Sequence, residues 1–114
     1  MKNQVFRQGD VLVKRTRKQP STVAKRVTDR GRTILAYGEV TGHCHEIVTP
    51  TVPGTDDVPA QELFEEPDGT RLLVLRHDGE LRHDEHGTIA LGKGTYEIVR
   101  QREYSPEAIR NVAD

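Results

Sequence analysis

Four of the five histidines in this chain fall into two close pairs. One residue separates His43 from His45, and two residues separate His83 from His86. Neutral imidazole is the commonest protein ligand for transition metals, and imidazole-rich sites suit zinc, iron, copper or nickel. The sequence therefore predicts a site for a divalent transition metal formed by both pairs, with zinc as the first expectation.

The first pair stands in a segment, 43–48, that is predicted to be extended. Alternate side chains of a strand share a face, so His43 and His45 point the same way with Cα atoms about 7 Å apart. Both rings can then reach one ion at ~2.0–2.1 Å from each nitrogen. Cys44 points to the opposite face and is not expected to be a ligand.

The second pair needs a less regular backbone to join the first. His83 and His86 would face opposite ways on a flat strand, but a turn or bulge, which Gly87 permits, lets both converge. Glu46, Asp84 and Glu85 lie beside the pairs, and each is a candidate for a fourth ligand, a hydrogen-bond partner of an imidazole, or a general base. Glu46 and Glu85 are the candidates taken as catalytic bases. Four imidazoles would make a structural site, whereas three imidazoles and a water would make a catalytic one. A hydrogen-bonded polar cluster without metal, or scattered surface histidines, are the alternatives.

The rest of the chain predicts short strands between turns. The hairpin signals are Pro67-Asp68-Gly69, between 63–65 and 71–75, and Gly92-Lys93-Gly94, between 88–91 and 95–99. Further strands are expected at 10–14, 23–27, 33–37 and 43–48. These patterns indicate a mainly β fold, a small antiparallel β-barrel or sandwich.

One domain spanning residues 1–114 is expected from the length. Within it, the proline-rich segment 49–60 is predicted to be a mobile internal loop. Ser105 is a good N-cap and Pro106 suits a first helical turn, so a short C-terminal helix is predicted over 105–112.

Composition excludes some classes of protein and leaves others open. Only 33% of the 114 residues are hydrophobic and there is no Trp, so the core is small. No apolar run approaches the ~20 residues of a membrane span. The single Cys44 and the lack of a signal-peptide core favour a cytoplasmic location. A small β domain often associates to cover its sheet edges, which makes a homo-oligomer an expectation.

A basic segment from Lys14 to Arg32 suggests a second class of function. It carries eight basic residues, namely Lys14, Arg15, Arg17, Lys18, Lys25, Arg26, Arg30 and Arg32, against a single acid. Such a segment either holds phosphates of a nucleic acid or forms the solvated face of a hairpin. The second interpretation is favoured, because aromatic residues typical of single-strand binding are absent there.

A smaller charged run, 100–104, ends the predicted strands. Alternation places Arg100, Arg102 and Tyr104 on one face. That face either lines a pocket for an anion or belongs to a charged edge strand, and the edge strand is favoured.

The segment His43-Cys44-His45, with a later histidine element and the glycine-rich segment 89–96, resembles the two-motif metal site of the cupins. Cupins are small β-barrels that hold a metal through His-x-His and a carboxylate from one motif and a histidine from the next. The resemblance implies that the first histidine pair supplies first-motif ligands and the second pair the later ligand. It is partial, because no histidine follows Gly94, where the second motif would place one.

A broader stretch, from His43 to Tyr104, is similar to small uncharacterised proteins of bacteria and their phages, and that resemblance implies no activity. The leading hypothesis is thus a small metal-binding β-barrel, either a metal-dependent hydrolase or another metalloenzyme. The alternatives are a non-enzymatic nucleic-acid-binding module and a structural or assembly protein in which the histidines stabilise the fold or an interface.

Overall fold

The computed structural model describes residues 4–37, 43–49, 59–84 and 86–100, and its regular elements in these ranges are β-strands. The predicted helix 105–112 and residues 50–58 of the predicted loop lie outside the described residues. The strands are β1 (Val5–Gln8), β2 (Val11–Thr16), β3 (Lys25–Val27), β4 (Thr33–Tyr37), β5 (Cys44–Val48), β6 (Gln61–Glu65), β7 (Arg71–Leu75), β8 (Gly79–Arg82), β9 (Ile89–Leu91) and β10 (Gly94–Arg100).

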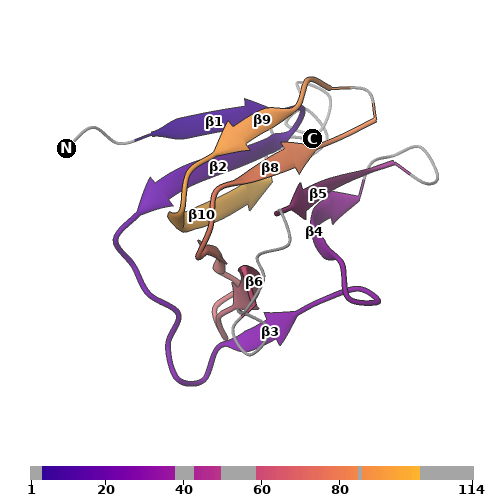
Figure 1. Cartoon of the computed structure of the whole chain (residues 1–114). Coiled ribbons are helices and arrows are strands. Elements are labelled where there is room, and N and C mark those ends of the chain that lie inside the picture. The colour runs from indigo at the N-terminus through magenta and orange to yellow at the C-terminus, as the bar shows by residue number, and fades with distance from the viewer. Residues whose placement is uncertain (1–3, 38–42, 50–58, 85, 101–114) are drawn as a thin grey trace, which may run out of the picture.

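The strands form two antiparallel sheets that face each other as a sandwich (Figure 1). The larger sheet has the order β1-β2-β10-β7-β6-β3, and the smaller one has the order β4-β5-β8-β9. The mainly β, antiparallel prediction is therefore confirmed in its sandwich form, and the sheets do not close into a barrel. No helix in the described ranges has the length and apolar character needed to cross a membrane.

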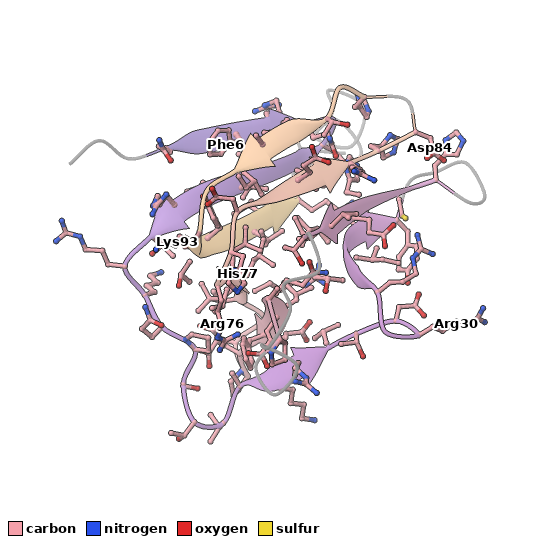
Figure 2. The ribbon with its side chains drawn as sticks, in the orientation of Figure 1. Phe6, Arg30, Arg76, His77, Asp84 and Lys93 are labelled. Atoms are coloured by element: carbon pink, nitrogen blue, oxygen red, sulfur yellow. The ribbon has the colours of Figure 1, made fainter. Side chains whose placement is uncertain are left out.

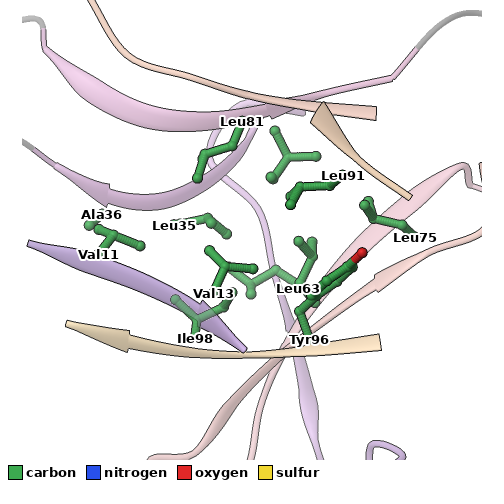
Figure 3. Packing of buried hydrophobic residues seen from close by; sticks show 12 residues of the cluster. Val11, Val13, Leu35, Ala36, Leu63, Leu75, Leu81, Leu91, Tyr96 and Ile98 are labelled. Carbon is green, nitrogen blue, oxygen red and sulfur yellow. The ribbon is translucent and has the colours of Figure 1, made fainter. Parts of the chain in front are cut away.

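The core lies between the two sheets. Val13 and Ile98 from the larger sheet face Leu81 and Leu91 from the smaller one (Figure 3). Tyr96 fills the same layer, and its side chain is fully buried. Alternation explains the inward set, because buried Val11 and Val13 on β2, and Gly79 and Leu81 on β8, occupy alternate positions of their strands.

One predicted hairpin is confirmed and the other is wrong. β6 and β7 pair around the turn at Pro67, with Leu63 opposite Leu73. β9 and β10 do not pair, since β9 joins β8 while β10 lies between β2 and β7. The Gly92–Gly94 turn instead crosses from one sheet to the other.

Arg15 holds this crossing in place. It donates a hydrogen bond to the carbonyl of Lys93 at 2.9 Å, and its guanidinium packs so closely on Gly94 that a Cβ there would lie 2.7 Å from Nη2. The Tyr96 hydroxyl donates to the Gly92 carbonyl at 2.7 Å. These contacts fix the turn against β2 and β10.

β1 was not among the predicted strands, yet it pairs with β2 along its whole length. Gly9 and Asp10 connect the two strands, and Gly9 adopts a left-handed φ of 59°. The residues of this tight connection contact His45 on β5 and the segment after β8, so Gln8, Gly9 and Asp10 lie beside the histidines.

Candidate functional site

The structure brings the four paired histidines together. His45 lies on β5, His43 directly precedes that strand, and His83 and His86 follow β8. The ring centroids of His45 and His83 are 4.3 Å apart, and those of His83 and His86 are 4.6 Å apart. The His43–His83 and His45–His86 separations are both 5.9 Å. Two pairs that lie far apart in the sequence therefore form one cluster.

Side chains alternate along β5, and His45 and Cys44 therefore lie on opposite faces, as predicted. His45 and Ile47 point inward and are 2% and 1% exposed. Cys44 and Glu46 lie on the other face, where both contact Arg32. Cys44 is thus turned away from the cluster, as expected.

The same alternation separates Glu46 from the histidines. Arg32 donates to both carboxylate oxygens of Glu46, at 2.7 and 3.0 Å. This hydrogen bond holds the pKa of Glu46 below its usual range. The structure therefore does not bring this candidate base into the cluster, and Glu85, the other candidate, lies outside the described residues.

Gln8 is the main support of the cluster, and its side chain is buried. Its amide nitrogen donates to the carbonyls of Leu81 at 3.0 Å and Gly87 at 2.9 Å. The amide oxygen must then face Nδ1 of His45, which lies 2.8 Å away. Because this oxygen only accepts, we assign the ring proton to Nδ1, which leaves the lone pair of the neutral ring on Nε2.

Asp10 lies on the Nε2 side of the same ring. Its Oδ1 is 3.6 Å from Nε2 of His45. Arg100 donates to the other carboxylate oxygen at 3.0 Å and to the carbonyl of Tyr37 at 2.5 Å. Burial raises the pKa of Asp10, but the hydrogen bond and charge of Arg100 outweigh it, so this pKa lies below its ordinary value.

The environment of His45 favours the neutral ring. Burial, the largest effect, lowers its pKa to about 4, and the neighbouring His83 and His86 act in the same direction. The carboxylate of Asp10 opposes them. A neutral imidazole is the form that binds a metal.

Gly9 lets the β1–β2 connection lie against the rings. A Cβ at this position would lie 2.8 Å from Nε2 of His86 and 3.3 Å from Cε1 of His45. The left-handed φ also favours glycine. Gly9 therefore serves both the turn and the close contact with the cluster.

The surroundings of His43 are more exposed to solvent than those of His45. Nε2 of His43 lies 3.7 Å from Asp84, whose side chain is 64% exposed. In Figure 2 Asp84 marks this end of the sandwich, whereas His77 lies apart from it, beside Arg76.

Sequence reasoning missed Gln8, Gly9, Asp10 and the role of Arg100. Asp10 was predicted only as the first residue of a strand, and Gln8 and Gly9 were given no role. Arg100 was assigned to an edge strand, which is wrong, because β10 lies inside the larger sheet. Arg102 and Tyr104 lie outside the described residues.

The basic segment is partly neutralised by acids. Three of its residues form ion pairs, which are Lys18–Glu97 at 3.5 Å, Arg26–Glu62 at 3.0 Å and Arg32–Glu46 at 2.7 Å. Arg15 is engaged with the β9–β10 crossing. These pairs fit the solvated-face interpretation better than a phosphate-binding surface.

As the described side chains stand, no three histidine, cysteine, aspartate or glutamate groups are arranged to hold one metal ion. The rings are near neighbours, but their donor atoms do not point at a common centre. Coordination therefore requires rings to turn about their side-chain torsions. His86 is exposed and has room to do so, whereas His45 is held by Gln8.

Comparisons with known proteins place the chain in a family. Neither the curated proteins nor the solved structures include a match to it. A family model described as a domain of unknown function, DUF8820, matches residues 7–101, a range that contains every described residue of the histidine cluster. The chain therefore belongs to the DUF8820 family.

Proposed function

We propose that this domain binds a divalent transition metal ion, with zinc as the first candidate, through His43, His45, His83 and His86. The observation that carries the proposal is the gathering of four imidazoles from two distant segments within 4.3–5.9 Å of their nearest ring neighbours. Imidazole nitrogens lie ~2.0–2.1 Å from zinc, so the centroids of two rings on one ion lie about 5 Å apart. The observed separations bracket this value, and the other three rings would have to rotate to direct their donor atoms to the same centre as His45.

The support around His45 favours metal binding over a simple polar cluster. Ligating histidines usually donate the other ring N–H to an oxygen acceptor, which fixes the tautomer and the ring orientation. Gln8 provides that acceptor for His45, and its amide is itself fixed by two backbone carbonyls. The Nε2 lone pair is left on the side of the ring where Asp10 lies.

The position of the cluster suggests a structural role for the ion. The rings lie where the β1–β2 connection of the larger sheet meets β5 and the end of β8 in the smaller sheet. An ion at this junction would link the two sheets. A ligand that binds only the folded state adds stability by mass action, about 2.7 kcal/mol at a free concentration of 100 times Kd. The geometry gives no comparable support to hydrolysis through Glu46, because Arg32 holds that carboxylate on the opposite face.

Metal analysis of protein made without a histidine tag tests this proposal. After reconstitution with zinc and desalting, we expect one ion per chain and a clear rise in Tm. His86→Gln, at an exposed ligand position, should lower the zinc affinity by at least about tenfold, a loss typical of disturbed metal sites. His77→Gln is the matched control and should bind as the wild type does. Background zinc content with no change in Tm would show that the histidines form only a polar cluster.

A further inference from the structure

We propose that Asp10 is a ligand of the same ion and supplies a carboxylate oxygen in place of one of the four imidazoles, because structural zinc sites are almost always four-coordinate. This inference rests on the proposed function. It changes the donor set from all-imidazole to mixed nitrogen and oxygen. Carboxylate donors suit zinc and other divalent ions, whereas Cu(I) prefers thiolate and thioether ligands. The site is thus assigned to a divalent ion by the chemistry of Asp10.

The distance between Asp10 and His45 carries the first step. Oδ1 of Asp10 and Nε2 of His45 are 3.6 Å apart, which is too long for a hydrogen bond. Zinc bonds to nitrogen and to carboxylate oxygen are both ~2.0–2.2 Å, so two donors on one ion lie roughly 3–4 Å apart. The observed separation therefore matches a pair of ligands and not a pair joined by a proton.

The orientation of the carboxylate carries the second step. Arg100 binds the Oδ2 oxygen at 3.0 Å and is anchored in turn on the Tyr37 carbonyl. Oδ1 is thereby turned toward His45. Ligating carboxylates are commonly held by hydrogen bonds of this kind, which fix the direction of the remaining oxygen.

The β1–β2 connection carries the third step. Gln8 meets the Nδ1 side of His45 and Asp10 meets its Nε2 side, so one short turn contacts both nitrogens of the same ring. Gly9, between them, lies against His45 and His86 without a side chain. Asp84 lies at a similar distance from another ring, 3.7 Å from Nε2 of His43, but its side chain is 64% exposed and, among the described residues, no hydrogen bond orients its carboxylate.

Three variants separate the ligand role from the other roles of Asp10. Asp10→Asn removes the charged ligand and weakens the pair with Arg100, whereas Arg100→Gln breaks the same pair and keeps the carboxylate. Asp84→Asn removes one negative charge from the other side of the cluster. We expect Asp10→Asn to lower the zinc affinity most, Arg100→Gln, which removes the hydrogen bond that orients the carboxylate, to lower it by about tenfold, and Asp84→Asn to lower it far less. The visible spectrum of bound Co(II), a stand-in for zinc, should change only in Asp10→Asn.

The outcomes are distinguishable from failure of the proposed function. If the wild type binds no zinc, the proposed function fails and this inference fails with it. If the wild type binds zinc and Asp10→Asn binds it equally with the same Co(II) spectrum, only the role of Asp10 is overturned. Should Asp10→Asn fail to fold, a zinc-loaded crystal structure of the wild type decides the question. An Asp10 oxygen about 2.0–2.2 Å from the ion supports the inference, and any clearly longer separation overturns it.

Discussion

Replacement of Gly9 by alanine tests the geometry of the cluster without removing any polar group. The added methyl would lie 2.8 Å from Nε2 of His86 and 3.3 Å from Cε1 of His45. His86 is exposed and can swing away, but His45 is buried and hydrogen-bonded to Gln8. The methyl group should therefore displace the His86 ring first and leave His45 in place.

The magnitude has two parts. A residue other than glycine in a left-handed conformation costs roughly 1–2 kcal/mol, and this applies to Gly9 at φ 59°. Gly69→Ala is a matched control, because Gly69 has φ 92° and no atom within 4 Å of its added Cβ. Both variants should lose about 1–2 kcal/mol of unfolding free energy, and Gly9→Ala should lose somewhat more through its ring contacts.

Urea unfolding measures the two free energies, and NMR of the imidazole nitrogens reports on the rings. A loss of 1 kcal/mol corresponds to a fall in Tm of about 4–8 °C for a domain of this size. Only Gly9→Ala should shift the His86 signals and weaken zinc binding. If Gly9→Ala matches Gly69→Ala in stability and leaves every imidazole signal and the zinc affinity unchanged, the turn does not lie against the rings and the described cluster is wrong.

Two further predictions concern the support of His45. Gln8→Leu removes three hydrogen bonds of a buried amide and should lower the unfolding free energy by about 2–4 kcal/mol, measured by urea titration. The control Gln19→Leu, at an exposed position, should have almost no effect. Equal small losses in the two variants would contradict the assigned network. In metal-free protein the pKa of His45 is about 4 when folded, against an ordinary 6.5, so the unfolded chain takes up the proton first as the pH falls. The stability from this ring is thus complete above about pH 6.5 and declines toward pH 4, by up to about 3 kcal/mol. His77→Gln should keep this pH profile, whereas a flat profile between pH 7 and 4.5 would show that His45 is not buried in its neutral form.

The sequence predicted most strands because their signals are local. Apolar residues that point into the core recur at alternate positions of β2 and β7, as with Val11 and Val13, and Leu73 and Leu75. The turn at Pro67 connects the two strands of the β6–β7 hairpin. β1 gave no such signal, since Val5 is 57% exposed while the polar Gln8 is 2% exposed. Alternation rules assume that polar residues face water, and this strand reverses the rule because the buried amide has its own partners.

The β9–β10 hairpin shows the opposite error. The Gly92–Gly94 turn has suitable residues for a hairpin, but pairing is decided by contacts distant in sequence. Arg15 on β2 binds the Lys93 carbonyl across 78 positions of the chain. Only the completed fold supplies that partner, so the local signal predicted a turn correctly and the pairing of its strands wrongly.

Some residues of the candidate site could be predicted from the sequence and others could not. Residue type and spacing identified the four histidines, and strand alternation placed Cys44 away from them. The partners of His45 were beyond reach, because Gln8 lies 37 positions earlier in the chain. Glutamine, glycine and aspartate before a strand are ordinary turn residues, and nothing in their types distinguishes a turn that faces solvent from one that contacts a buried ring.

The contacts of the two ring nitrogens of His45 indicate where an ion would lie. Buried polar groups are normally held by complementary partners, and the Nδ1 side meets this rule through a 2.8 Å contact with Gln8. The Nε2 side faces a carboxylate oxygen at 3.6 Å, a separation at which a shared proton gives no proper hydrogen bond. Arg100 holds that carboxylate from behind, so the oxygen is directed by a contact other than His45. A ring fixed on one nitrogen, with its other nitrogen beside a fixed anion, is arranged for a cation on the Nε2 side.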